Sequence, residues 1–209
     1  MDSVIQQAWQ RLELLGEISD EPGVLTREFG GPGMERASAL LTQWMDEAGL
    51  ITERDGWGNV FGQTPVSDRP RVVLGSHFDT VRNAGRFDGP LGILAAMACV
   101  ELLRDRWDIL PFQLEVAAFS DEEGARFQSA YLGSRAAIGA ISEEDLLRGD
   151  SRGIFLRELI PSGHQEPIPR YTPDSLLAYL EIHIEQGPVL EHHNLPVGVV
   201  TDIAGQTRM

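Results

Sequence analysis

The sequence has little cysteine and few basic residues, and each shortage excludes a class of protein. The single cysteine, Cys99, excludes an intrachain disulfide and favours a reducing compartment. Lysine and arginine number 17 against 32 acidic residues, which gives a formal net charge of −15 over 209 residues. This charge repels phosphate backbones and anionic membrane surfaces, so we expect no nucleic acid and no membrane as a partner.

Long apolar runs are also missing. The run from Leu91 to Leu103 is well short of the about 20 residues that a membrane-spanning helix needs, and we expect Cys99 within it to be a small buried side chain. The N-terminus, "MDSVIQQAWQRLELL", lacks the basic and apolar regions of a secretory signal. Since 42% of the residues are hydrophobic, the chain can bury a sizeable core. We therefore expect a soluble, cytoplasmic protein.

Residue spacing predicts the local structure. Helices are expected at 2–15, 34–48 and 90–104, the second from apolar residues that repeat with helical spacing. The stretch "LITERDGWGNVFGQ" predicts a hairpin in which Asp55 and Gly56 take positive φ angles. Short helices and loops are expected in 141–175, and "LPVGVVTDIAGQTRM" is expected to begin another strand.

Two strands are expected to meet at the centre of the fold. "RVVLGSH" and "FQLEVAAF" flank the expected helix at 90–104, and this order is typical of parallel pairing in an α/β protein. Ligands collect beyond the carboxyl ends of such strands. The sequence places His77 at one of these ends and the pair Glu122–Glu123 just beyond the other.

The segment "YLEIHIEQGP" alternates polar and apolar side chains. As a strand it places Tyr179, Glu181, His183 and Glu185 on one face. Such a face is either a solvent-exposed edge or the wall of a site, and His183 on its own fits both.

The other polar groups also have ordinary structural explanations. His77 fits a strand-end histidine that hydrogen-bonds Asp79, and Asp88 before a glycine fits a turn or a helix cap. Glu122 and Glu123 fit exposed carboxylates in the first turn of a helix. Taken together, however, imidazole and carboxylate are the ligands that zinc and similar divalent ions take in catalytic sites. A carboxylate can also orient a ligating histidine, bridge two metals or act as a general base.

Three stretches carry a family resemblance: "GSHFDTV…GRFDGPLGILA", "SDEEGARF…YLGSR" and "HIEQGPVLE". They resemble the binuclear zinc amidohydrolases that hydrolyse N-carbamoyl-L-amino acids, allantoate and β-ureidopropionate, within the wider zinc aminoacylase and carboxypeptidase clan. The resemblance covers nearly the whole chain. It implies a mixed, largely parallel sheet with helices on both faces, in which 1–204 form the N-terminal part of a catalytic domain and 205–209 begin a lid domain.

The resemblance also implies a set of metal ligands. His77, Asp88 and His183 would hold one metal, and Asp88 would bridge to a second metal that Glu123 also holds. Zinc is the implied ion, two per subunit in the complete enzyme, with manganese, cobalt or nickel as substitutes. The second metal then has only two protein ligands, and the third would be a histidine outside this sequence.

Other roles follow from the same resemblance. Glu122 would be the general base, Asp79 would orient His77, and Gln186 matches a position associated with substrate contact. The remaining histidines, His164, His192 and His193, are expected to be surface residues, an expectation that does not depend on the resemblance.

The sequence matches about half of such an enzyme, and this leaves alternatives open. The lid would mediate homodimerisation, so the 209-residue chain alone is expected to be inactive and to fold poorly or self-associate. The substrate is a small ureido or carbamoyl compound, with a slight preference for allantoate. A peptidase or aminoacylase of the same clan is one alternative, and a non-catalytic fragment that binds at most one metal is another.

Overall fold

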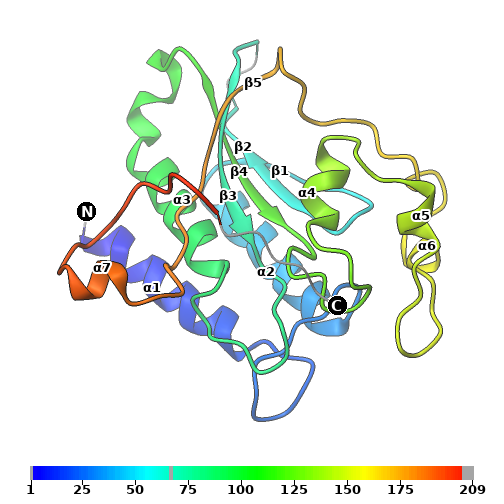
Figure 1. Cartoon of the computed structure of the whole chain (residues 1–209). Helices are drawn as coiled ribbons and strands as arrows, with labels where there is room; N and C mark the ends of the chain where they lie inside the picture. The colour runs from blue at the N-terminus through cyan, green and yellow to red at the C-terminus, as the bar shows by residue number, and fades with distance from the viewer. Residues whose placement is uncertain (1, 66–67, 204–209) are drawn as a thin grey trace.

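A computed structural model describes residues 2–65 and 68–203 and contains one mixed β-sheet (Figure 1). Within these residues the strand order is β1-β2-β4-β3-β5. The strands are β1 (Ile51–Arg54), β2 (Val60–Gln63), β3 (Arg71–His77), β4 (Gln113–Phe119) and β5 (Leu176–Leu180). β3 pairs in parallel with both β4 and β5, whereas β2 runs antiparallel to β1 and β4. The predicted parallel pairing of the two central strands is confirmed.

Three long helices cover one face of the sheet. They are α1 (Asp2–Glu17), α2 (Pro32–Glu47) and α3 (Pro90–Leu102), and a 3-10 helix η1 (Arg104–Ile109) follows α3. Their apolar faces form the main core with side chains of β2, β3 and β4, among them Val60, Val72 and Val116. All three helices were predicted, because helical spacing and flanking Gly and Pro residues mark them in the sequence.

The opposite face is covered by the chain between β4 and β5. This stretch contains α4 (Leu132–Ala137), α5 (Glu143–Leu146) and α6 (Leu156–Leu159). The last two agree with the short helices predicted within 141–175, whereas α4 lies before that range and was not predicted. Glu115 of β4 is fully buried on this face and accepts hydrogen bonds from Arg170 at 2.9 and 3.0 Å and from the Tyr171 hydroxyl. A buried carboxylate needs such partners, so this network fixes the path of the chain as it enters β5.

Two local expectations are wrong. In the β1–β2 hairpin the positive φ angle falls on Gly58 (φ 80°), not on Asp55 or Gly56. Asp55 instead accepts hydrogen bonds from the backbone amides of Trp57 and Asn59, which closes a longer turn. Cys99 is only half-buried, because it lies on the side of α3 that turns away from the core.

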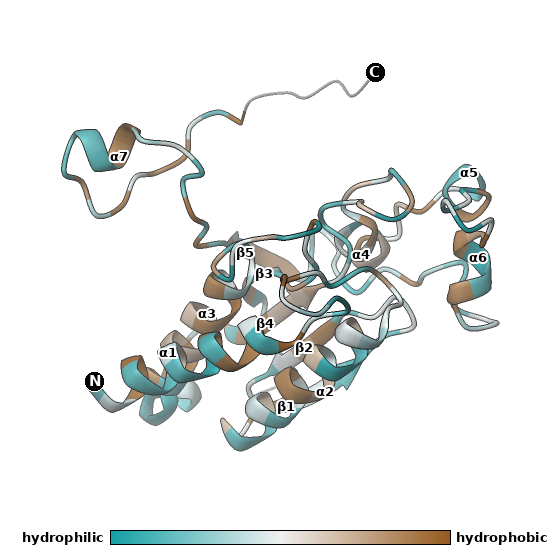
Figure 2. Cartoon of the chain, turned by 90° about the horizontal axis from the view of Figure 1, so that it is seen from below, coloured by the Kyte–Doolittle hydropathy of each residue, from teal (hydrophilic) through white to brown (hydrophobic). Residues whose placement is uncertain are grey.

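The C-terminal part departs most from the prediction. β5 ends at Leu180, so the alternating residues 181–185 do not continue as a strand, and 195–203 form no strand either. A short helix, α7 (Val189–His192), follows, and Figure 2 shows it standing away from the sheet. Residues 205–209, where a lid domain was expected to begin, lie outside the described part of the chain. No helix in the described ranges is long and apolar enough to cross a membrane.

Candidate metal centre

The candidate site lies where β3 and β4 end side by side. His77 is the last residue of β3 and is in register with Phe119, the last residue of β4. The chain after each strand therefore starts from the same edge of the sheet, as expected for parallel strands. His77 is 2% exposed and Asp79 is 1% exposed, so both belong to the wall of the site and not to its open surface.

Asp79 connects the two strand ends. Its Oδ1 atom accepts a hydrogen bond from the backbone amide of Glu122 at 2.9 Å, and its Oδ2 atom accepts one from Glu123 at 3.1 Å. The Nδ1 atom of His77 lies 3.4 Å from Asp79 Oδ1 and 3.2 Å from the Asp79 carbonyl oxygen. These contacts leave Nε2 of His77 directed toward the site, which is the arrangement that orients a metal ligand.

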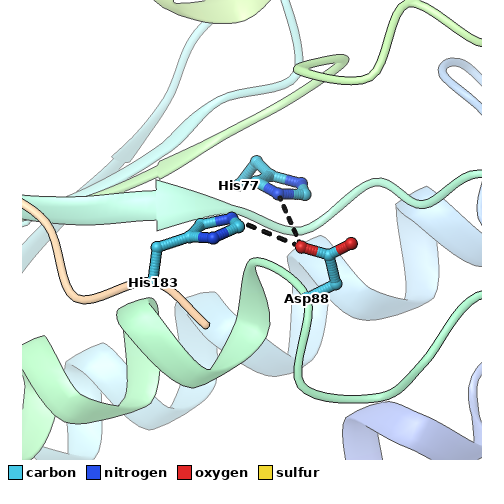
Figure 3. A group of neighbouring side chains, drawn as sticks. All are labelled: His77, Asp88 and His183. Carbon is cyan, nitrogen blue, oxygen red and sulfur yellow. Dashed lines mark ion pairs between the residues drawn. The ribbon is translucent and has the colours of Figure 1, made fainter. Parts of the chain in front are cut away.

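The first group of ligand atoms consists of His77, Asp88 and His183 (Figure 3). The Nε2 atoms of His77 and His183 lie 4.0 and 3.3 Å from Asp88 Oδ1, and the two imidazole rings stack with centroids 5.9 Å apart. The three ligand atoms all lie within 4.8 Å of one another. The chain thus brings together, from β3, the turn before α3 and the segment after β5, the three residues expected to share one metal.

Asp88 takes this position because Gly89 follows it. Gly89 precedes α3 with φ 84°, and a Cβ atom there would lie 2.4 Å from the carbonyl oxygen of His77 and 2.7 Å from its ring. Only glycine fits such a close approach at a positive φ angle. The Asp-Gly pair lies in the turn that caps α3, as expected, and its glycine also allows close packing against the candidate ligand.

The donor set fits a divalent cation. Asp88 Oδ1 is buried and accepts no hydrogen bond, although two imidazole nitrogens face it. A buried carboxylate oxygen without a donor is unfavourable unless a cation satisfies it. Two imidazole nitrogens and one carboxylate oxygen also match the three protein ligands of a catalytic zinc site.

A second group contains His77, Glu122 and Glu123. The Nε2 atom of His77 lies 3.9 Å from Glu122 Oε2. Burial lowers the pKa of His77, but the hydrogen bond and charge of Asp79, with the charges of both glutamates, outweigh it and raise the pKa to about 9. Burial also raises the pKa of Glu122, against the effect of His77. The site therefore carries surplus negative charge, which favours a bound cation. Asp88, expected to share a metal with Glu123, is not part of this second group.

Gln186 also lies at the site. Its Nε2 atom donates a hydrogen bond of 2.9 Å to Asp88 Oδ2, the oxygen that does not face the histidines. The residue expected to contact substrate therefore contacts a candidate metal ligand in this structure. His164, His192 and His193 are exposed, as expected, and belong to neither group of ligand atoms.

The sequence reasoning did not predict the contact between two residues beside the site. Ser76 precedes His77 and donates a hydrogen bond of 2.7 Å to Glu181, two residues before His183. The only sequence signal for this contact is that Glu181 and His183 share one face of the alternating segment. The hydroxyl partner on β3 becomes visible only once the two strands lie side by side.

The chain resembles known proteins over nearly its whole length. It is 44% identical to a probable allantoate deiminase of Oryza sativa subsp. japonica, an alignment that covers 95% of this chain and 43% of that protein. It is 42% identical to an N-carbamoyl-L-amino acid amidohydrolase of Geobacillus stearothermophilus, over 96% of this chain and 51% of that protein. The chain thus spans about half the length of these curated relatives.

The fold comparison agrees with the sequence comparison. The crystal structure of a hydantoinase/carbamoylase family amidase from Burkholderia ambifaria matches with a TM-score of 0.77 and 34% identity, over 90% of this chain and 47% of that one. The sequence profile of peptidase family M20/M25/M40 matches residues 73–204, which include both groups of ligand atoms. Because that match covers more than half of the sequence, the chain belongs to peptidase family M20/M25/M40.

Proposed function

We propose that this chain supplies the metal-binding core of a hydrolase that cleaves linear C–N bonds in ureido or N-carbamoyl groups. The observation that carries the proposal is the pair of ligand groups sharing His77 at the ends of β3 and β4. The substrate class is supported by relatives 44% and 42% identical, which are named as an allantoate deiminase and an N-carbamoyl-L-amino acid amidohydrolase.

The proposed ligand assignment keeps His77, Asp88 and His183 for one cation and adds Asp88 with Glu123 for a second. Zinc is the proposed ion, because imidazole and carboxylate suit it, and manganese, cobalt or nickel could replace it. A bound divalent cation would lower the pKa of a bound water molecule and would polarise the carbonyl group that is attacked.

The chain's own residues handle the proton. We assign Glu122 as the general base, since burial raises its pKa and its carboxylate lies beside the candidate ligands. It accepts a proton as the water oxygen bonds to the carbonyl carbon, and it returns that proton to the nitrogen as the C–N bond breaks. Cleavage of this bond releases ammonia and leaves a carbamic acid, which loses carbon dioxide as its remaining C–N bond breaks and frees the amine or ureido product. Asp79 keeps His77 and the Glu122 backbone in place during this transfer.

Gln186 is the proposed substrate contact. Its amide already reaches Asp88, so a small movement would turn it toward a ureido group beside the cations. Assembly as a homodimer and a cytoplasmic location belong to the same proposal. The first rests on the resemblance, and the second rests on the single cysteine.

The test is ammonia release by the zinc-loaded protein, expressed as its gene encodes it. Allantoate and an N-carbamoyl-L-amino acid are the proposed substrates, and a dipeptide and an N-acetyl amino acid are the controls. Ammonia from either ureido compound, abolished by a chelator and restored by zinc, supports the proposal. Cleavage of the dipeptide or the acetyl compound alone would replace it with the peptidase or aminoacylase activity of the clan.

A further inference from the structure

His183 reaches the candidate metal centre from a segment that the sheet does not hold. β5 pairs with β3 only as far as Leu74 and Leu180, and 181–185 form no strand. The Nδ1 atom of His183 contacts the carbonyl oxygen of Ile184 at 2.9 Å, which is the next residue along the chain. A contact this local does not fix the segment relative to β3, so the position of His183 depends on other anchors.

The side chain of Glu181 joins this segment to β3 and β5 beyond the end of the strand pairing. Its Oε1 atom accepts a hydrogen bond of 2.7 Å from Ser76 Oγ on β3, and its Oε2 atom accepts one of 2.7 Å from the Tyr179 hydroxyl on β5. Ser76 is 1% exposed and directly precedes His77. Burial and the hydrogen bond to Glu181 raise the pKa of Tyr179, so its hydroxyl remains a donor.

Glu181 is itself exposed, but the backbone directly after it lies close to α3 and β3. A Cβ atom at Gly92 of α3 would lie 2.4 Å from the carbonyl oxygen of Ile182 and 2.7 Å from Ser76 Cβ. The ring of Tyr179 lies 6.1 Å from the ring of Phe119 at the end of β4. The backbone at Ile182 therefore lies so close to α3 that no side chain fits at Gly92. The hydrogen bonds of Glu181 are made directly beside this contact.

We propose that Glu181 is a positioning residue: by joining Ser76 to Tyr179, it holds His183 where that residue and His77 can share a cation with Asp88. The inference rests on the proposed function, because it requires His183 to be a ligand. Glu181 acts through the segment that carries His183 and not on the substrate. Partners that orient a ligand in this way typically contribute about 10–100-fold to metal affinity.

The test measures zinc affinity by isothermal titration calorimetry on the whole chain. Glu181→Ala should weaken binding by about 10–100-fold. Glu181→Gln should stay close to the unaltered protein, because its amide can pair with two hydroxyls that either donate or accept. Glu191→Ala removes an exposed carboxylate from α7 and serves as the matched control, with no expected change. Ser76→Ala and Tyr179→Phe each remove one donor and provide milder variants if Glu181→Ala does not fold.

Two further measurements separate positioning from general stability. In a His183→Ala background, Glu181→Ala should cause no additional loss of zinc affinity, whereas general destabilisation would add its own loss. In the metal-free protein, Glu181→Ala should increase the fast backbone motion of 182–186 but not that of β3, as measured by NMR order parameters. Unchanged affinity and unchanged order parameters would overturn the inference and leave the proposed metal site standing. If the unaltered protein bound no zinc, the proposed function would fail, and the order parameters would still report whether Glu181 holds the segment.

Discussion

The Oδ1 atom of Asp79 accepts a hydrogen bond of 2.9 Å from the backbone amide of Glu122, which joins the end of β3 to the end of β4. The same carboxylate also accepts from the Glu123 amide and lies beside His77 Nδ1. Asp79 is therefore more than an orienting partner for one histidine. It sets the positions of the candidate base and of a candidate ligand from a second strand.

Replacing Asp79 should disturb both strand ends. Asp79→Asn presents an amide NH₂ to at least one backbone N–H, so one buried donor loses its acceptor at a cost of about 1–3 kcal/mol. We expect zinc affinity to fall by about 10–100-fold, since the orientation of His77 is lost as well. Calorimetric zinc titration and urea unfolding check the two effects. Unchanged values for both would show that Asp79 does not couple the strands.

The two glutamates should respond differently to the same substitution. Glu122→Gln should keep its metal content and lower turnover by about 10²–10⁴-fold, because general-base catalysis is lost while the site stays intact. Glu123→Gln should instead lower the metal content measured by elemental analysis. The reverse outcome, with metal lost in Glu122→Gln and kept in Glu123→Gln, would exchange the two roles.

Gly89 should not tolerate a side chain. Gly89→Ala places a Cβ atom 2.4 Å from the carbonyl oxygen of His77 at φ 84°, so it combines backbone strain with a steric clash. We expect a loss of about 2–4 kcal/mol in unfolding free energy, together with weaker zinc binding. Gly85→Ala on the same loop is the matched control, because no atom lies within 4 Å of its Cβ position. Equal stability of the two variants in urea unfolding would contradict the close approach.

The carboxyl group of Asp145, away from the metal centre, should make the free energy of unfolding depend on pH. Burial raises its pKa, but hydrogen bonds from Arg135 and Ser142 outweigh burial and hold the pKa of that carboxyl well below its usual value of 3.8. A lowered pKa in the folded state stabilises the fold above about pH 4, and this contribution is lost as the pH falls further.

The Asp145 contribution can be isolated by mutation. In urea unfolding with a chelator present, the loss between about pH 7 and pH 3 should include about 1 kcal/mol that Asp145→Asn removes, because over this range the contribution falls only as the unfolded-state carboxyl, with its usual pKa of 3.8, becomes protonated. Glu144→Gln is the control, since Glu144 is an exposed neighbour whose ion pair is worth little. An identical pH dependence for Asp145→Asn and the unaltered protein would refute the assignment.

The central fold was predictable from local signals. The strands at 71–77 and 113–119 and the helix between them carry strong hydrophobic patterns, and their order dictates parallel pairing. Parallel pairing in turn brings His77 close to Glu122 and Glu123, since the carboxyl ends of the strands share one edge. The gathering of these residues follows from topology and needs no knowledge of side-chain detail.

What the sequence could not reveal depends on long-range contacts. Alternation continues past Leu180 as if the strand did, but backbone pairing with β3 stops there and side-chain bonds of Glu181 take over. The two hydrogen bonds that Asp79 accepts from backbone amides likewise form only when both strand ends are in place. Gly58, and not Gly56, takes the positive φ angle because Asp55 uses its side chain to build the turn.

The C-terminal part of the described chain leaves apolar side chains in contact with water. Leu177 on the edge strand β5 is 60% exposed, and Val199 and Ile203 are 94% and 88% exposed. An edge strand with apolar side chains pairs readily with another copy of the chain. The net charge of −15 causes repulsion between copies, but salt screens this repulsion.

We therefore expect the 23.0 kDa chain to self-associate. Size-exclusion chromatography with light scattering should show species above the monomer mass, and added salt should increase them. Leu177→Lys combined with Val199→Lys should shift the chain toward monomer, because a charge on the edge strand β5 and one in the exposed segment after α7 oppose pairing with another copy. Ile109→Lys removes an isolated aliphatic side chain that is 78% exposed on η1, and it should leave association unchanged. A compact monomer for the unaltered protein at about tens of micromolar would show that these exposed apolar side chains do not drive self-association.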